Sequence, residues 1–223
     1  MNPIIVIATH NREEITTINL KLLKKQNCEI IVVVSDPVEI NWYVEYATVI
    51  VHPNNPLGKK WQIGVNHARK LNASHVIITG SDDILSKNFF EYLLPFSEEA
   101  EIDFVGLRQW YVFNEGNLYR LEYLAQRNLP LGGGRIYSRS YLEYLNWQVF
   151  EERKNKLLDD WGWLNHTCRH NVYLHQKPEI LAIKGNWPVM NPMDLNHKNV
   201  KLLATYEGQE ALNIMKEKFD YEP

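Results

Sequence analysis

The chain has 223 residues, of which 45% are hydrophobic and 23% are charged, and this is the composition of a folded globular protein, not of a disordered or fibrous one. The length predicts a single domain over residues 1–223. Lysine and arginine total 24 against 27 aspartate and glutamate residues, a net charge of −3. Without a basic surplus, we expect no nucleic-acid partner.

The amino-terminal segment is not typical of an export signal. Its apolar run after Pro3 is short and is followed by the acidic Glu13 and Glu14. Two cysteines, Cys28 and Cys168, are too few for a disulfide framework. We therefore expect a soluble, cytoplasmic protein without a membrane span.

The first half of the chain alternates between two patterns. Continuous apolar runs that end in polar turns occupy residues 3–8, 29–37 and 73–83. Apolar residues at helical spacing lie between them, over residues 15–23 and 59–71. Buried strands that alternate with amphipathic helices predict an α/β fold with a mostly parallel sheet flanked by helices. We assign residues 1–100 to this doubly wound, nucleotide-binding half.

The second half, residues 101–223, predicts a smaller antiparallel part. Residues 103–113 and 118–124 flank a polar turn and indicate a hairpin. A helix should follow the glycine cluster 132–134, with Ser140 and Glu143 as its capping box. The remaining predictions are helices at 159–169 and 207–219, short strands at 172–175 and 179–184, and a long polar loop over 185–199.

Polar clusters follow each of the three buried runs. They are Thr9-His10-Asn11-Arg12, Ser35-Asp36 and Gly80-Ser81-Asp82-Asp83. Because ligands of open parallel sheets bind at the carboxyl ends of the strands, these clusters mark the expected site. The first turn has no glycine, and the stretch Gly58-Lys59-Lys60 lacks the Walker spacing, so an NAD or P-loop enzyme is disfavoured.

Two acidic pairs suggest chemistry. Asp82 and Asp83 directly follow a strand, where adjacent carboxylates are costly unless a cation neutralises them, and oxygen ligands suit Mg²⁺ or Mn²⁺. The alternative is a turn and helix-cap signal. Asp159 and Asp160 precede Trp161, which would place a general base beside a ring for sugar stacking. A helix start with a core tryptophan is the alternative there.

In this order the motifs resemble those of the GT-A glycosyltransferases, close to the family-2-like inverting enzymes. The resemblance spans about residues 3–170, from Thr-His-Asn-Arg through Ser-Asp-Asp, as the DxD-type motif, to Asp-Asp-Trp-Gly. It is nearest to the small stand-alone GT-A domains of large algal viruses, which would place the protein in a host cytoplasm. The resemblance implies a GT-A fold.

It also implies a role for each matching residue. The nucleotide would contact Thr9, His10, Arg12, Asp36, Lys59 and Asp82. The donor sugar and acceptor would lie against Gly133, Gly134, Asp159 and Trp161, with Asp160 as the catalytic base. Asp83 would ligate the metal; because Ser81 replaces the first carboxylate of the motif, His197 is the candidate for a second ligand. The pair His166 and His170 could instead bind zinc.

The implied reaction is metal-dependent transfer of a sugar from a nucleoside-diphosphate sugar to an acceptor hydroxyl, with inversion. Mn²⁺ or Mg²⁺ would be the cofactor, a UDP-sugar the favoured donor, and a glycan or glycoprotein the acceptor. Two alternatives stay open. One is a sugar-nucleotide nucleotidyltransferase, and the other is a non-catalytic, carbohydrate-binding GT-A pseudoenzyme.

Overall fold

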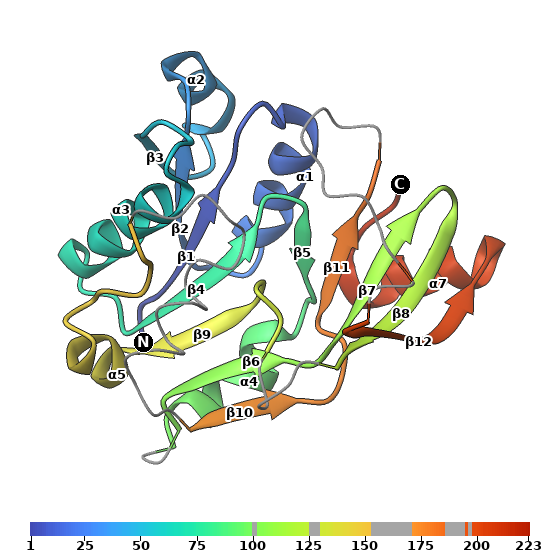
Figure 1. Ribbon diagram of the computed structural model, residues 1–223. Coiled ribbons are helices and arrows are strands. Elements are labelled where there is room, and N and C mark those ends of the chain that lie inside the picture. The colour runs from blue at the N-terminus through green and yellow to red at the C-terminus, as the bar shows by residue number, and fades with distance from the viewer. Residues whose placement is uncertain (100–101, 125–129, 153–170, 186–194, 196–197) are drawn as a thin grey trace.

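Two β-sheets organise the computed structural model, which describes residues 1–99, 102–124, 130–152, 171–185, 195 and 198–223 (Figure 1). The seven-stranded sheet contains β1 (Pro3–Ala8), β2 (Glu29–Val34), β3 (Thr48–Val51), β4 (His75–Gly80), β6 (Phe104–Leu107), β9 (Arg135–Ser138) and β10 (Val172–His175). The five-stranded sheet contains β5 (Asp83–Leu85), β7 (Gln109–Asn114), β8 (Asn117–Tyr123), β11 (Ile180–Ile183) and β12 (Val200–Tyr206).

The order of the larger sheet is β10-β6-β9-β4-β1-β2-β3, and β9 alone runs antiparallel to its neighbours. The smaller sheet, β12-β8-β7-β11-β5, is antiparallel except for the pair β11 and β7. The predicted α/β fold, with a mostly parallel central sheet and an antiparallel part in the second half, is therefore confirmed.

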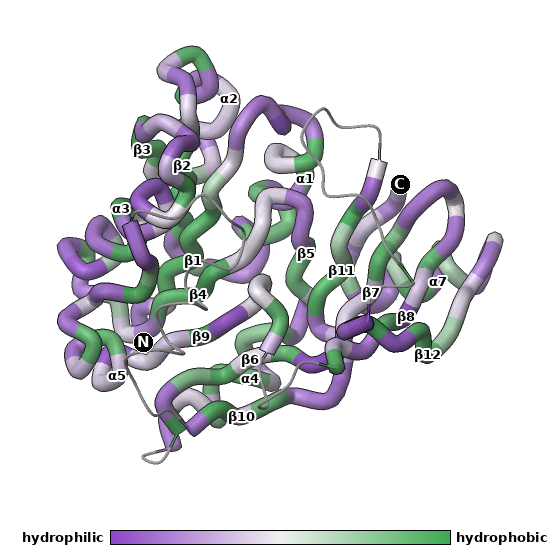
Figure 2. The backbone as a smooth tube through the Cα atoms, in the orientation of Figure 1, coloured by the Kyte–Doolittle hydropathy of each residue, from purple (hydrophilic) through white to green (hydrophobic). Residues whose placement is uncertain are grey.

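Helices cover both faces of the larger sheet. They are α1 (Glu13–Lys24), η1 (Pro37–Glu39), α2 (Ile40–Tyr43), α3 (Leu57–Lys70), α4 (Phe89–Ser97) and α5 (Arg139–Tyr144), and α7 (Gly208–Phe219) packs on the smaller sheet. On β1, Ile4 and Val6 face α3 and α5, whereas Ile5 and Ile7 face α1 and α4. This double burial produces the continuous apolar run in the sequence, and Figure 2 shows β1 and β4 coloured mainly as hydrophobic.

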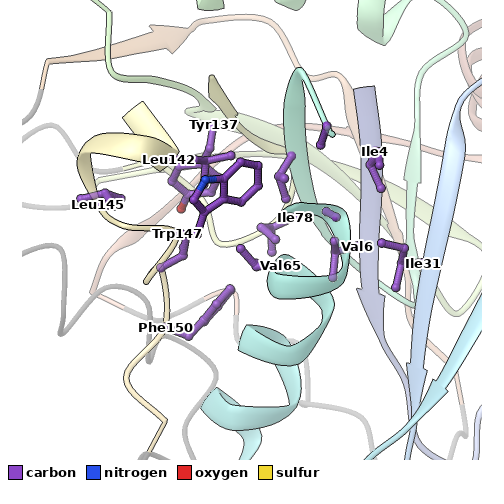
Figure 3. Close-up of a cluster of buried hydrophobic side chains, with 14 of the residues drawn as sticks. Ile4, Val6, Ile31, Val65, Ile78, Tyr137, Leu142, Leu145, Trp147 and Phe150 are labelled. Atoms are coloured by element: carbon purple, nitrogen blue, oxygen red, sulfur yellow. The ribbon is translucent and has the colours of Figure 1, made fainter. Parts of the chain in front are cut away.

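A cluster around Trp147 joins α3 and α5 to one face of the sheet (Figure 3). The side chain of Trp147 is almost fully buried beside Leu142 and Tyr137. Gln62 of α3 holds this segment, since its amide donates to Trp147 O at 2.6 Å and accepts from the backbone of Val149 at 3.0 Å. The buried glutamine is thus satisfied by backbone groups, as buried amides must be.

Three element predictions were wrong in detail. The run 103–113 is two strands, because β6 pairs in the larger sheet and β7 in the smaller one. The run 73–83 also divides, into β4 and β5. The strand β9 lies between the glycine cluster and α5, and the helix cap is Ser138, whose Oγ accepts from Tyr141 N at 3.3 Å, rather than Ser140.

The remaining element predictions are either confirmed or fall outside the described residues. The strands at 172–175 and 179–184 and the helix at 207–219 correspond to β10, β11 and α7. The predicted helix at 159–169 and most of the loop at 185–199 lie outside the described residues. Within the described ranges, none of the helices combines the length and the apolar character that crossing a membrane requires.

A buried carboxylate ties α7 to the strands. Glu179 is 1% exposed, and it accepts hydrogen bonds from Ser86 Oγ and, at 2.9 Å, from Lys218 Nζ of α7. Although burial opposes ionisation, the hydrogen bonds from Ser86 and Lys218, together with His175 Nε2 at 3.8 Å, hold the pKa of Glu179 below its usual value. The charged form therefore stabilises the fold.

We expect Glu179→Gln to lower the free energy of unfolding by about 2 kcal/mol at pH 7, because it removes a charged acceptor of buried hydrogen bonds. Since the pKa is lower in the folded state, this stabilisation is present above the unfolded-state pKa and is lost as pH falls through the folded value. The two proteins should thus converge in acid. Urea unfolding at pH 7 and pH 3 measures the difference.

Glu143→Gln is the matched control, because Glu143 pairs with Arg139 at 2.7 Å on the surface, with 54% of its side chain exposed. Exposed pairs contribute about 0–1 kcal/mol, so this variant should be close to wild type. Equal effects of the two substitutions would contradict the role of Glu179.

Candidate active site

A cavity of about 210 Å³ opens at the carboxyl ends of β1 and β4. This is the edge of a parallel sheet where ligands bind. Its walls come from the segment after β1, the start of α3 and the turn after β4. The lining residues are Ala8, Thr9, His10, Arg12, Asn54, Leu57, Trp61, Gly80, Ser81 and Asp82.

Asp82 lies between two cations. Arg12 Nη1 is 3.1 Å from Oδ1, and Lys184 Nζ is 2.9 Å from Oδ2. Arg12 also donates to Ser81 Oγ at 3.2 Å. Lys184 follows β11, and the backbone of Ile183 donates to Asp82 O at 2.9 Å. These two contacts of Asp82 connect the turn after β4 to the smaller sheet.

Asp83 is packed against glycine on two sides. Its Oδ2 accepts a hydrogen bond from Gly80 N at 3.0 Å. A Cβ atom built on Gly80 or on Gly133 would lie 2.6 Å from the same oxygen, which is closer than carbon and oxygen can approach. Burial, followed by the charge of Asp82, raises the pKa of Asp83 to about 6, and Lys184 opposes this shift.

We expect Gly133→Ala to lower turnover about tenfold or more, because the new methyl group must displace the Asp83 carboxylate and small misplacements in a site are costly. Initial rates measure the effect, and thermal unfolding shows whether the fold persists. Gly116→Ala is the control: Gly116 has a φ of +82° but no atom within 4 Å of a built Cβ. It should lose some stability and keep its rate. Equal rates of the two variants would contradict the packing argument.

The described carboxylates fit a divalent cation that is ligated partly by substrate phosphates, rather than one ligated by protein side chains alone. Both oxygens of Asp82 are paired with cations, and Asp83 Oδ2 accepts from Gly80. Among the described residues, no group of three or more His, Cys, Asp or Glu side chains could hold a metal. Mg²⁺ is commonly held by one or two carboxylates plus substrate phosphates, which Asp83 suits.

The structure brings together many of the residues predicted for the nucleotide. Thr9, His10, Arg12 and Asp82 all line the cavity. Gly133 contacts Asp83 beside it, whereas its neighbour Gly134 has a φ of +72° and donates to Ile78 O at 2.7 Å. The candidates Asp159, Asp160, Trp161, His166, His170 and His197 lie outside the described residues.

Two predicted nucleotide contacts do not join the cavity lining. Asp36 is exposed and caps η1, accepting from Val38 N at 3.0 Å. Lys59 is exposed on α3. The neighbouring Lys60 is instead completely buried behind the cavity, and so is Glu39. The sequence prediction missed both; each is a charged residue at an inward position of its helix, and that position is recognisable only once it is known which face of the helix packs on the sheet.

A doubly wound sheet with an acidic pair at a strand end and a cavity beside it is typical of nucleotide-binding α/β proteins, the class in which the GT-A nucleotide-sugar transferases fall. The sequence model of the family Glycosyl transferase family 2 matches residues 4–170. The chain therefore belongs to glycosyl transferase family 2. The GT-A fold expected from the motifs is confirmed.

Solved structures with the same fold include S. aureus TarS 1-349, with a TM-score of 0.57 and 17% identity over 82% of this chain and 60% of that chain. TarS in complex with UDP-GlcNAc has a TM-score of 0.59 and 18% identity, over 83% and 59% of the two chains. The chain thus spans about 60% of the TarS chain.

A third similar structure is CMP:2-keto-3-deoxy-manno-octonic acid synthetase complexed with CTP, with a TM-score of 0.52 and 14% identity over 81% of this chain and 91% of that chain. At these identities the likeness concerns the fold alone. Among curated proteins, none matches this chain.

Proposed function

We propose that this protein transfers a sugar from a UDP-sugar to a hydroxyl group of a glycan or glycoprotein, by a single displacement with inversion. The observation that carries the proposal is the cavity at the carboxyl edge of β1 and β4, where Arg12, Asp82 and Lys184 meet beside Asp83. The complex of TarS with UDP-GlcNAc, which shares the fold, supports UDP as the nucleotide.

The cavity suits the nucleoside end of the donor. Its volume of about 210 Å³ is below the roughly 300–1,000 Å³ of pockets that enclose whole drug-sized ligands, so only part of a sugar nucleotide fits inside. Trp61 lines it and stacks on Phe150, with ring centroids 5.7 Å apart, which offers an aromatic wall for a base. The diphosphate would extend toward Arg12 and Lys184.

Phosphates near these two cations would compete with Asp82 for them. Arg12 and Lys184 each donate charge-assisted hydrogen bonds to Asp82 without a ligand, and a diphosphate offers more acceptor oxygens and more charge. The cations would therefore be shared between the carboxylate and the donor. This arrangement stabilises negative charge on the leaving diphosphate.

Mn²⁺ or Mg²⁺ completes the proposal, with Asp83 as a ligand and His197 as the candidate for a second. Such an ion supplies charge stabilisation at the diphosphate oxygens. On the protein's side, Asp160 would accept the proton of the attacking hydroxyl, and the backbone at Gly133 and Gly134 would lie against the donor sugar.

The test is a panel of UDP-, GDP- and CMP-sugars, each with and without Mn²⁺, with release of the nucleotide as the measurement. We expect UDP release that depends on Mn²⁺ and rises when an acceptor glycan is added. Anomeric configuration of the product, read by NMR, tests inversion. Metal-dependent binding without any release would instead favour a non-catalytic, carbohydrate-binding protein.

A nucleotidyltransferase is the second candidate, because a CTP-bound synthetase shares the fold over 91% of its own chain. It would consume a nucleoside triphosphate and a sugar and would release pyrophosphate. Assaying pyrophosphate in parallel separates the two reactions, and its release in place of UDP would overturn the transferase proposal.

A further inference from the structure

Lys60 is a fully buried lysine with every donor hydrogen engaged. From the first turn of α3, its Nζ donates to Thr9 O, to Ser35 Oγ at 2.7 Å and to Asn54 Oδ1 at 3.2 Å. An ammonium group has three donors, and all three are satisfied here. Burying such a charge is costly unless it is hydrogen-bonded, so its retention inside the fold calls for a reason.

The three acceptors belong to three separate segments. Thr9 directly follows β1, Ser35 directly follows β2, and Asn54 precedes α3. One side chain thus holds together the two strand ends and the segment that leads into the helix.

Glu39 also connects two of these segments, the one after β1 and the one after β2. Its side chain is also fully buried, with Oε1 accepting from Asn11 N at 2.8 Å and Oε2 accepting from Ser35 N at 3.0 Å. His10 Nδ1 lies 3.5 Å from Oε1. Asn11 has a φ of +52°, so the backbone turn that presents His10 is one that needs such support.

Lys60 itself does not line the cavity, but the groups around it do. Thr9 and Asn54, which it binds, are lining residues, and so are Leu57 and Trp61, its neighbours on α3. Its ammonium therefore lies behind the wall and acts on a ligand only through the segments it joins.

We propose that Lys60 is a positioning residue for the nucleotide: its charged form holds the segments after β1, after β2 and before α3 in the arrangement that binds the base. This inference rests on the proposed function of the cavity. Because the wall is held before a ligand arrives, less ordering remains to be done on binding, which raises affinity.

The charge of Lys60 responds to pH near neutrality. Burial lowers its pKa to about 8; Glu39 opposes this shift and Arg12 adds to it. His10 is next to Glu39, and Tyr43 stays neutral because burial raises its pKa to about 12. A neutral amine has two donors, so above pH 8 one of the three segments loses its hydrogen bond.

The experiment measures the Kd of UDP with Mg²⁺ by calorimetry at pH 7 and pH 9, for wild type, Lys60→Met and the control Lys70→Met. Lys70 is an exposed lysine in the last turn of the same helix. We expect wild type and Lys70→Met to bind about five- to tenfold more weakly at pH 9. Lys60→Met should be about tenfold weaker at pH 7, with no further loss at pH 9.

Ser35→Ala is a second variant, which keeps the charge of Lys60 and removes one of its acceptors. It should raise the Kd of UDP several-fold at pH 7, and it keeps the proposal testable if Lys60→Met does not fold. UDP binding by Lys60→Met or Ser35→Ala with the wild-type Kd and pH profile would overturn the positioning role while leaving the proposed function intact. Failure of the wild-type protein to bind UDP at either pH would overturn both.

Discussion

Replacing Asp83 by asparagine should reduce turnover about 100-fold or more, the loss typical when one preorganised electrostatic group is removed from a site. Asp83 is the proposed metal ligand of the acidic pair, since both oxygens of Asp82 are already paired with Arg12 and Lys184. The amide oxygen of asparagine can still accept from Gly80 N, so the fold should persist. Calorimetry with UDP should show that Mn²⁺ no longer strengthens binding.

Asp103→Asn is the matched control. Asp103 is also a carboxylate that accepts from a backbone amide, Asn171 N at 2.6 Å, but it lies just before β6, away from the cavity. This variant should turn over like wild type. If Asp83→Asn kept the wild-type dependence of UDP affinity on Mn²⁺, Asp83 would be excluded as a metal ligand.

Asp160→Asn should abolish transfer, with a loss of about 10²–10⁴ in turnover, because general-base catalysis contributes that much. An asparagine cannot take the proton of the acceptor hydroxyl. Since the nucleotide contacts proposed above involve other residues, the Kd of UDP should stay within about twofold. Nucleotide release and calorimetry on the same preparation separate the chemical step from binding.

Glu152→Gln serves as its control, because Glu152 is an exposed carboxylate upstream of the acidic pair. Wild-type turnover of Asp160→Asn would show that another group is the base. A parallel loss of UDP affinity would instead place Asp160 in nucleotide binding.

The sequence predicted the alternation of strands and helices in the first half because the burial of these elements is visible there in the pattern of apolar residues. Residues on both faces of β1 and β4 are buried, which yields unbroken apolar runs. The strand β9 was missed for the opposite reason. It begins at Arg135, which is 1% exposed and donates to carbonyl groups such as Leu131 O at 2.7 Å, so a charged residue starts a strand in the interior of the sheet.

The candidate site was predictable where its residues follow a strand directly. Thr9, Arg12 and Asp82 lie within four residues of the end of β1 or β4, and they line one cavity. Lys60 could not be told from Lys59, because which of two adjacent lysines points inward depends on how α3 packs. That packing rests on a tertiary contact: a Cβ on Gly64 would lie 2.4 Å from Val6 Cγ1, which brings this helix face against β1.

Lys184 was also not predicted, since it lies far from Asp82 in the sequence and reaches it only through the pairing of β11 with β5. Local patterns carry no information about such a contact. Long-range pairings of this kind therefore mark the limit of what the sequence alone predicts here.

The turn Ser81–Asp82 lies where the chain passes from the larger sheet to the smaller one, as β4 ends at Gly80 and β5 begins at Asp83. The acidic pair therefore lies in the connection between the two sheets and does not belong to one sheet alone. We expect a substitution that tilts the smaller sheet, even one far from the cavity, to shift the two carboxylates as well. Variation in that sheet is thus mechanically coupled to the site, and directed evolution there should change turnover without altering any residue that lines the cavity.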